Sequence, residues 1–152
     1  MTAAQKIMLI HGPNLNLLGK REPEIYGADT LADVEGWCRD AGAGAGVAVD
    51  CRQSNHEGEI VTWIHEARET AAAIVINAGA YTHTSVAIHD ALRAFDGVII
   101  ELHISNPHLR EAFRNLSYIG PTATAQIAGF GVKAYPRAIR AVAKLLTQPA
   151  QN

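Results

Sequence analysis

The 152-residue chain has little of what marks several large classes of protein. Its two cysteines, Cys38 and Cys51, form no CxxC motif, and we expect them to be buried, reduced thiols. The formal net charge is only -2 and no lysine-rich run occurs, which leaves no basic surface for nucleic acid. These absences exclude a disulfide scaffold, a cysteine-based zinc cage and a nucleic-acid partner.

Long apolar runs are also missing. No stretch approaches the roughly 20 residues that span a membrane, which argues against a membrane partner. The opening segment MTAAQKIMLIHGPN lacks the apolar length of a secretory signal, because Pro and Asn soon follow the short run IMLI. We therefore expect a cytoplasmic protein.

The short motifs of several catalytic classes are absent. The first apolar run leads into HGPNLN, which is not the glycine-rich loop of a P-loop or a dinucleotide site. No serine stands in a GxSxG turn, and the histidines lack HExxH spacing. No lysine stands plainly at a buried strand end, where a Schiff-base amine would be desolvated. What remains is acid–base catalysis on a small polar molecule, with no metal and no cofactor.

The residues that are present predict one α/β domain. Hydrophobic residues make up 48% of the chain, which suits a single catalytic domain over residues 1–152 with a frayed tail at 147–152. Apolar runs without polar interruption are typical of parallel strands buried on both faces. The runs are Ile7–Ile10, Val47–Val49, Ile74–Ile76, Val98–Ile100 and the weaker Ala125–Gly129.

Helix-like segments alternate with these runs. The first is expected to be capped by Thr30 or Asp29 and to run through about Ala43, and the second to be capped by Asn55 and to run through about Ala72. The third is expected to start at Thr84 and run through Phe95, and the last to span Arg137 to Leu146. A shorter helix is expected after Asn106, with Arg110 and Arg114 one turn apart. This alternation, with right-handed crossovers, predicts a doubly wound, five-stranded parallel sheet in flavodoxin-like order.

Polar segments follow the strong strands, at the edge where parallel α/β sheets bind ligands. They are HGPNLN, RQSNHEG, NAGAYTHT and ELHISN. Some of their residues have plain structural interpretations: Asn14 and Asn77 can tie loops to backbone, and Gln53–Asn55 can cap or brace a loop. Structural or solvated roles are also expected for His11, His56, His65 and His108.

The pair Glu101 and His103 is harder to explain as structure alone. The two residues are two apart at a strand end, and their side chains therefore leave the same face of the sheet. A carboxylate beside an imidazole fixes its tautomer and raises its basicity. The pair is therefore a candidate acid–base unit.

The charged segment GKREPEIYG, residues 19–27, is expected to be a mobile, solvated loop. It contains Tyr26 close behind Arg21. The tyrosine either covers a surface patch or gives the loop a chemical role.

Four long motifs lie in order between about Lys6 and Leu145. They are HGPNLNLLGKREPEIYG, QSNHEGEIVTWIHEA, INAGAYTHTSVAIHDAL and ELHISNPHLREAFRNLSYI. Together they resemble the type II 3-dehydroquinate dehydratases. The resemblance implies a flavodoxin-like fold and conversion of 3-dehydroquinate to 3-dehydroshikimate, in the shikimate pathway or in quinate breakdown. It also implies a homo-oligomer, a dodecamer built from trimers, and catalysis without metal or Schiff base.

The resemblance also implies individual roles. Tyr26 would be the general base, with Arg21 as the cation beside it, and His103 would be the general acid. Asn14 would stand near the developing enolate oxygen. The residues expected to hold substrate are Asn77, His83, Ile104, Ser105 and Arg114, with Asp90 reaching a neighbouring subunit's site and Arg110 in support.

The chemistry of a dehydration explains these residue types. A cation favours the tyrosinate that a base requires, and Gly19 and Gly27 could serve as hinges of the loop. Backbone N–H groups of Ile104 and Ser105, at the start of the expected short helix, would bind the substrate carboxylate.

Two other classes share the expected fold. A phosphoacceptor receiver domain needs an acidic cluster after the first strand and an aspartate ending the third, where this chain has HGPN and Asn77. An FMN-binding domain needs a Ser/Thr-rich phosphate loop after the first strand, and HGPNLN is not one.

Overall fold

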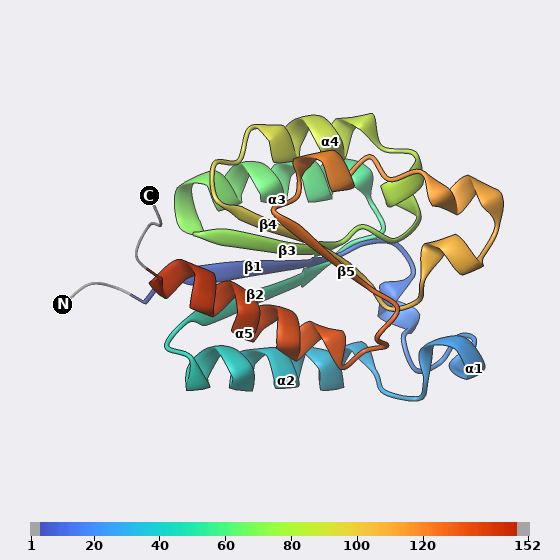
Figure 1. Ribbon diagram of the computed structural model, residues 1–152, viewed down its shortest axis with the longest axis horizontal. Helices are drawn as coiled ribbons and strands as arrows, with labels where there is room; N and C mark the ends of the chain where they lie inside the picture. The colour runs from blue at the N-terminus through green and yellow to red at the C-terminus, as the bar shows by residue number, and fades with distance from the viewer. Residues whose placement is uncertain (1–3, 149–152) are drawn as a thin grey trace.

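Five parallel strands form a single sheet with helices on both faces (Figure 1). The computed structural model describes residues 4–148, apart from the side chains of Ile25 and Tyr26. The strands are β1 (Lys6–His11), β2 (Ala48–Gln53), β3 (Ala73–Asn77), β4 (Val98–His103) and β5 (Ala125–Ala128). Their order is β2-β1-β3-β4-β5 and every pair is parallel, which confirms the predicted flavodoxin-like order.

Two layers of helices enclose the sheet (Figure 1). One layer holds α2 (Leu31–Gly44) and α5 (Ala134–Thr147), and the other holds α3 (Glu57–Thr70) and α4 (Val86–Arg93). Alternate strand residues point to opposite layers: Leu9 and Val75 join the first core, and Met8 and Ile74 join the second. Within residues 4–148, no helix has the length and apolar character needed to cross a bilayer.

Two helix starts show how local sequence sets the boundaries. Thr30 caps α2 through a capping box with Asp33, in which each side chain accepts the other residue's backbone N–H. The start of α4 is set by Ser85, whose Oγ accepts the N–H of Ile88 at 2.9 Å. The predicted start at Thr84 is therefore two residues too early, since the first helical residue is Val86.

Two other helix starts also differ from the prediction. The N-cap of α3 is His56, not Asn55, and it makes no side-chain cap bond. The last helix begins at Ala134 rather than Arg137, because Pro136 fits in a first turn, where its missing N–H costs nothing. This helix continues through Thr147, the first residue of the predicted tail.

The segment after β4 departs most from prediction. It forms two short 3₁₀ helices, η3 (Pro107–Leu109) and η4 (Ala112–Asn115), instead of one helix. The Asn106 side chain accepts the N–H of His108 at 3.1 Å, and the backbone is already extended at Arg110. No longer hydrogen-bond ladder can form across that extended residue. Arg110 and Arg114 therefore do not lie one turn apart on one helix.

The two cysteines were expected to be buried, reduced thiols, and the structure confirms this only in part. Cys38 in α2 is buried, Cys51 in β2 is half-buried, and both are free. Burial raises the pKa of each thiol to about 12 and keeps both protonated.

The loops after β1 and β3 meet at the carboxyl edge of the sheet. The N–H of Gly12 donates to the carbonyl of Asn77 at 2.7 Å. A Cβ at Gly12 would lie 2.4 Å from the carbonyl oxygen of Ala78, and only glycine permits this approach. The remaining short helices are η1 (Leu15–Leu17), α1 (Pro23–Tyr26), η2 (Gly79–His83) and η5 (Gly120–Thr122).

Candidate active site

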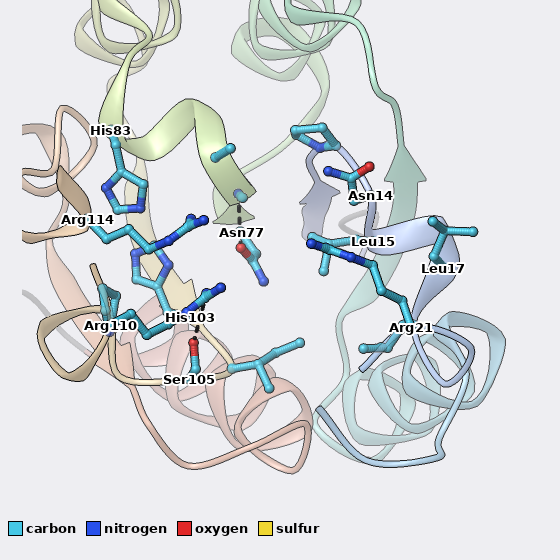
Figure 2. Close-up of a pocket in the computed structure, with 16 residues that line it drawn as sticks. Asn14, Leu15, Leu17, Arg21, Asn77, His83, His103, Ser105, Arg110 and Arg114 are labelled. Atoms are coloured by element: carbon cyan, nitrogen blue, oxygen red, sulfur yellow. Dashed lines mark hydrogen bonds between the residues drawn. The ribbon is translucent and has the colours of Figure 1, made fainter. Parts of the chain in front are cut away.

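A pocket opens at the carboxyl edge, between the loop after β1 and the segment after β4 (Figure 2). Asn14, Leu17 and Arg21 stand on one side of it, and His83 and His103 on the other. Its lining residues are Pro13, Asn14, Leu15, Leu17, Leu18, Arg21, Asn77, Gly79, Ala80, His83, His103, Ile104, Ser105, Pro107, Arg110 and Arg114. This is the edge at which the fold predicts a ligand.

Most of the predicted site residues are brought together here. Those that line the pocket are Asn14, Arg21, Asn77, His83, His103, Ile104, Ser105 and Arg114. Glu101 lies behind His103 rather than in the lining. Asp90 is exposed on α4 and does not line this pocket. The side chain of Tyr26 lies outside the described part of the structure.

The loop carrying Asn14 is braced by residues after β2. Asn14 has a left-handed backbone with φ 69°, a conformation that asparagine tolerates better than most residues. Its N–H donates to Asn55 Oδ1 at 3.0 Å, and Gln53 Nε2 donates to the same atom at 3.2 Å. The second polar segment therefore acts as a loop brace, with neither Gln53 nor Asn55 lining the pocket.

Asn77 both ties its loop and lines the pocket. Its Nδ2 donates to the Tyr135 hydroxyl at 2.9 Å, and its Oδ1 accepts the N–H of Gly79 at 3.1 Å. Burial raises the pKa of Tyr135, so this phenol stays neutral. These two bonds fix the amide plane, and the structural interpretation of Asn77 holds alongside a site role.

His11 is the last residue of β1 and is not among the residues that line the pocket. Its ring is fully buried and packs on Tyr135 with ring centroids 5.3 Å apart. Burial lowers the pKa of His11 to about 3, so the ring stays neutral. A neutral, packed ring agrees with a structural role.

Glu101 and His103 form the expected pair on β4. Nε2–H of His103 donates to Glu101 Oε2 at 2.7 Å, and the carboxylate is 1% exposed. With Nε2 engaged, Nδ1 is the ring nitrogen left for a ligand. The arrangement can hold an imidazolium and direct its second proton toward the pocket.

Three guanidinium groups give the pocket a positive character. They belong to Arg21, Arg110 and Arg114, and none of the described residues that line the pocket carries a carboxylate. Arg114 Nε donates to Glu111 outside the lining, and this hydrogen bond holds the Glu111 pKa below its usual value. Arg110 lies within 3.5 Å of Ser105 Oγ. Such a lining favours a small anionic ligand.

His83 is held in one tautomer. Its Nδ1–H donates to the carbonyl of Leu116 at 2.7 Å, because a carbonyl can only accept. Nε2 is therefore the nitrogen available to a ligand, as an acceptor when the ring is neutral.

The segment of residues 19–27, which we call the lid segment after its expected role, contains a short helix as well as loop. It contains the short helix α1, with Pro23 at its first position. Gly19, Glu22 and Gly27 have φ of 85°, 45° and 82°, all in the left-handed range. Gly19 and Gly27 thus have the backbone freedom expected of hinges.

Several residues that line the pocket were not predicted from the sequence. Leu15, Leu17, Leu18 and Pro107 form its apolar wall, and apolar loop residues carry no distinctive chemical signal. Arg110 was expected only as support, yet it lines the pocket beside Arg114. Within residues 4–148, His, Cys, Asp and Glu side chains form no group of three suited to a metal ion.

The fold, and the polar and charged residues gathered in a pocket at its carboxyl edge, are those of an α/β enzyme. The family model for class II dehydroquinases matches residues 5–143, and the chain therefore belongs to this family of hydro-lyases. A 3-dehydroquinate dehydratase of Variovorax paradoxus (strain S110) is 59% identical over 143 residues, covering 91% of this chain and 98% of that protein.

Two solved structures extend the similarity to the whole fold. The type II dehydroquinase of Butyrivibrio crossotus DSM 2876 has a TM-score of 0.89 at 43% identity, covering 93% of this chain and 99% of that one. The type II dehydroquinase of Propionibacterium acnes has a TM-score of 0.88 at 38% identity, covering 95% and 99%. These similarities leave no room for the receiver and FMN-binding alternatives.

Proposed function

We propose that the protein dehydrates 3-dehydroquinate to 3-dehydroshikimate through an enolate, with Tyr26 as general base and His103 as general acid. The reaction serves the shikimate pathway or quinate breakdown. The observation that carries the proposal is the 2.7 Å Glu101–His103 pair in a pocket lined by three arginines. Removing a proton next to a ketone and expelling a hydroxyl from the β carbon requires a base, an oxyanion donor and an acid.

The base is assigned to Tyr26 on the lid segment. A free tyrosine ionises only near pH 10, about three units above neutrality, and it therefore needs a cation to act as a base. Arg21, which lines the pocket, supplies a charge that is permanent at any working pH. Closure of the lid segment over substrate would bring both groups to the ring and exclude water.

The anionic parts of the substrate meet separate donors. Asn14, directly or through a water, stabilises the enolate oxygen. The carboxylate binds the backbone N–H groups of Ile104 and Ser105. The expected helix dipole contributes little, because both residues precede a 3₁₀ helix of only three residues. Nearby arginines supply the missing charge.

The ring hydroxyls are held by Arg114 and by Nε2 of His83, with Asn77 alongside. The leaving hydroxyl receives its proton from Nδ1 of His103. Glu101 stabilises the imidazolium and sets its orientation.

Full activity depends on a homo-oligomer, a dodecamer built from trimers. Asp90 is exposed on α4 and completes a neighbouring subunit's pocket. Large apolar side chains on the segments after β4 and β5 also lack cover: Leu109 is 83% exposed, Phe113 65% and Phe130 68%. Exposed apolar surface of this kind marks sites of association.

The test is ultraviolet detection of the conjugated enone formed from 3-dehydroquinate. The wild type should produce it, and His103→Ala should lower kcat by about 10²–10⁴ while still binding substrate. His56→Ala, outside the pocket, is the matched control and should be unaffected. No enone from the wild type would overturn the activity, and a His103→Ala rate within a few-fold of wild type would overturn the acid.

A further inference from the structure

Glu101 is held by more than His103. Its Oε2 also accepts a hydrogen bond from Ser117 Oγ at 2.6 Å, next to the 2.7 Å contact with His103. The other oxygen, Oε1, is buried and has no hydrogen-bond partner within the described residues. The orientation of this carboxylate therefore rests on its Oε2 contacts.

The direction of the Ser117 bond follows from its surroundings. Ser117 Oγ accepts the N–H of Ile119 at 3.1 Å and that of Gly120 at 2.9 Å. Two donors already point at the oxygen, and its own hydrogen is left to point at Glu101. The turn after η4 thus fixes a hydroxyl donor against a buried carboxylate.

We propose that Ser117 is a positioning residue for the general acid: its hydroxyl holds the Glu101 carboxylate against His103 Nε2, which leaves Nδ1 free to face the pocket. The inference rests on the role of His103 in the proposed function. Ser117 is not among the described residues that line the pocket, so it acts through Glu101 rather than on the substrate. No bond is made or broken through it, and its proton stays on Oγ throughout.

The physical reason is the balance of one proton between two neighbours. A donor to Oε2 lowers the basicity of the carboxylate, so the proton stays on the imidazole. Without that donor, Glu101 competes for the proton, and the neutral imidazole that results is a weaker acid. The pair as a whole also holds its proton more tightly, because the deprotonated pair loses the donor that stabilised its negative charge.

This predicts a signature that ordinary loosening of a turn would not give. In Ser117→Ala, kcat should fall by about tenfold or more and KM should change little. The basic limb of the kcat–pH profile should move to higher pH. The other charged or titratable residues that line the described pocket with His103 are unchanged in this variant, and they are Arg21, His83, Arg110 and Arg114.

Thr122→Val is the matched control. The Thr122 hydroxyl donates to the carbonyl of Ile119 at 2.6 Å, in the same turn but away from Glu101. Its removal should leave both kcat and the pH profile as in wild type. Ser117→Thr keeps the hydroxyl and should restore the rate. Ser117→Cys is a weak donor, should behave like Ser117→Ala, and carries the test if the alanine variant does not fold.

The outcomes separate the two proposals. If His103→Ala is inactive while Ser117→Ala and Ser117→Cys match Thr122→Val in rate and pH profile, the role of Ser117 is refuted and the general acid stands. If His103→Ala remains active, the general acid is wrong and the positioning role falls with it.

Discussion

Arg21 carries a permanent positive charge into a pocket whose proposed base is a tyrosine. Arg21→Ala should lower kcat at neutral pH by about 10²–10³, because the charge that favours tyrosinate is lost. The rate should recover in part as the pH approaches about 10, where tyrosine ionises without help. The kcat of Arg21→Lys should lie between those of wild type and Arg21→Ala, since an ammonium supplies charge without the guanidinium fork. The measurement is the kcat–pH profile of each variant.

Tyr26→Phe is the companion variant. It removes only the hydroxyl, and turnover should nearly vanish at every pH while substrate still binds. An active Tyr26→Phe, together with no recovery of Arg21→Ala at high pH, would show that the lid segment merely covers the pocket.

The pocket also has no lysine in its lining, and no group of three potential metal ligands occurs within residues 4–148. Lys133, for example, lies 3.6 Å above the Trp37 ring, away from the site. Exhaustive dialysis against a chelator, and separately borohydride with substrate, should both leave activity intact. Inactivation by the chelator would indicate a metal, and inactivation by borohydride would indicate an imine.

The sequence predicted some single residues better than others. The Glu101–His103 pair could be predicted, because two residues spaced two apart on a strand place their side chains on the same face. The role of Ser117 could not be predicted, because its contact with Glu101 joins two segments that are separate in the sequence. The apolar wall at Leu15 and Leu17 was equally hidden, since nothing in a leucine distinguishes a pocket from a core.

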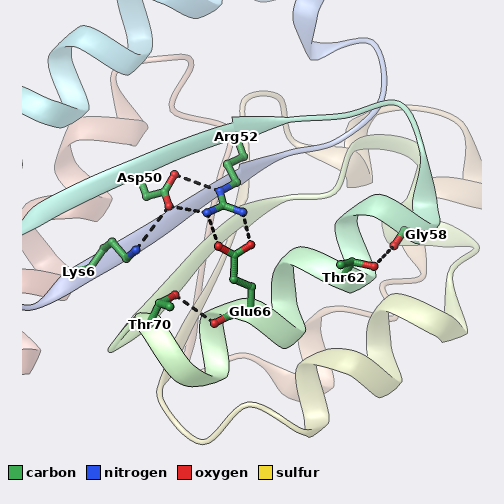
Figure 3. Close-up of polar contacts among 7 residues, drawn as sticks. All are labelled: Lys6, Asp50, Arg52, Gly58, Thr62, Glu66 and Thr70. Carbon is green, nitrogen blue, oxygen red and sulfur yellow. Dashed lines mark hydrogen bonds and ion pairs between the residues drawn. The ribbon is translucent and has the colours of Figure 1, made fainter.

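At the scale of elements, the edge strand β2 is tied down by charge (Figure 3). The Arg52 guanidinium donates to both carboxylate oxygens of Asp50 at 3.1 and 2.8 Å, and to those of Glu66 on α3 at 2.6 and 2.9 Å. Lys6 on β1 lies 3.7 Å from Asp50. The network links the edge strand β2 to its neighbour β1 and to helix α3.

Arg52→Gln should lower the free energy of unfolding by about 1 kcal/mol at neutral pH, since the Asp50 pair is partly buried and bidentate. The hydrogen bond from Arg52 holds the Asp50 pKa below its usual value. The stabilisation is therefore present above the unfolded pKa of about 4 and is lost as the pH falls through the lower folded pKa. The measurement is urea unfolding at fixed protein concentration, at pH 7 and below pH 4. The difference in free energy of unfolding between variant and wild type should be smaller at the lower pH.

Arg39→Gln is the control for this prediction. Arg39 contacts Glu35 at 3.2 Å on α2, but its side chain is 56% exposed, and its loss should have little effect. An Arg52→Gln difference that persists unchanged at low pH, or an equal effect of Arg39→Gln, would contradict the role given to the network.

The same strand shows where prediction of elements fails. The apolar run predicted a strand ending at Val49, yet β2 continues to Gln53, because Arg52 pairs with Asp50 and with Glu66 on α3. The buried strands β1 and β3 were predicted well, since burial on both faces forces a continuous apolar run. The starts of the helices were predicted less accurately, since neighbouring residues such as Thr84 and Ser85 can each serve as an N-cap.

At the scale of the whole molecule, the pocket of one chain holds no acidic lining residue, while Asp90 stands exposed elsewhere. If Asp90 completes a neighbour's pocket, Asp90→Ala should keep the oligomer in sedimentation and raise KM. Asp96→Ala removes another exposed carboxylate near the end of α4 and should be silent.

A mixing experiment distinguishes sharing between subunits from an effect within one subunit. His103→Ala removes the acid from a subunit's own pocket, whereas Asp90→Ala would damage only its neighbour's. In an oligomer containing both variants, an Asp90→Ala subunit beside a His103→Ala subunit regains one complete pocket, because it keeps His103 and receives an intact Asp90. Co-expressed variants should therefore exceed the summed activity of the two separate oligomers at subsaturating substrate. Activity equal to that sum would place the effect of Asp90 within its own chain.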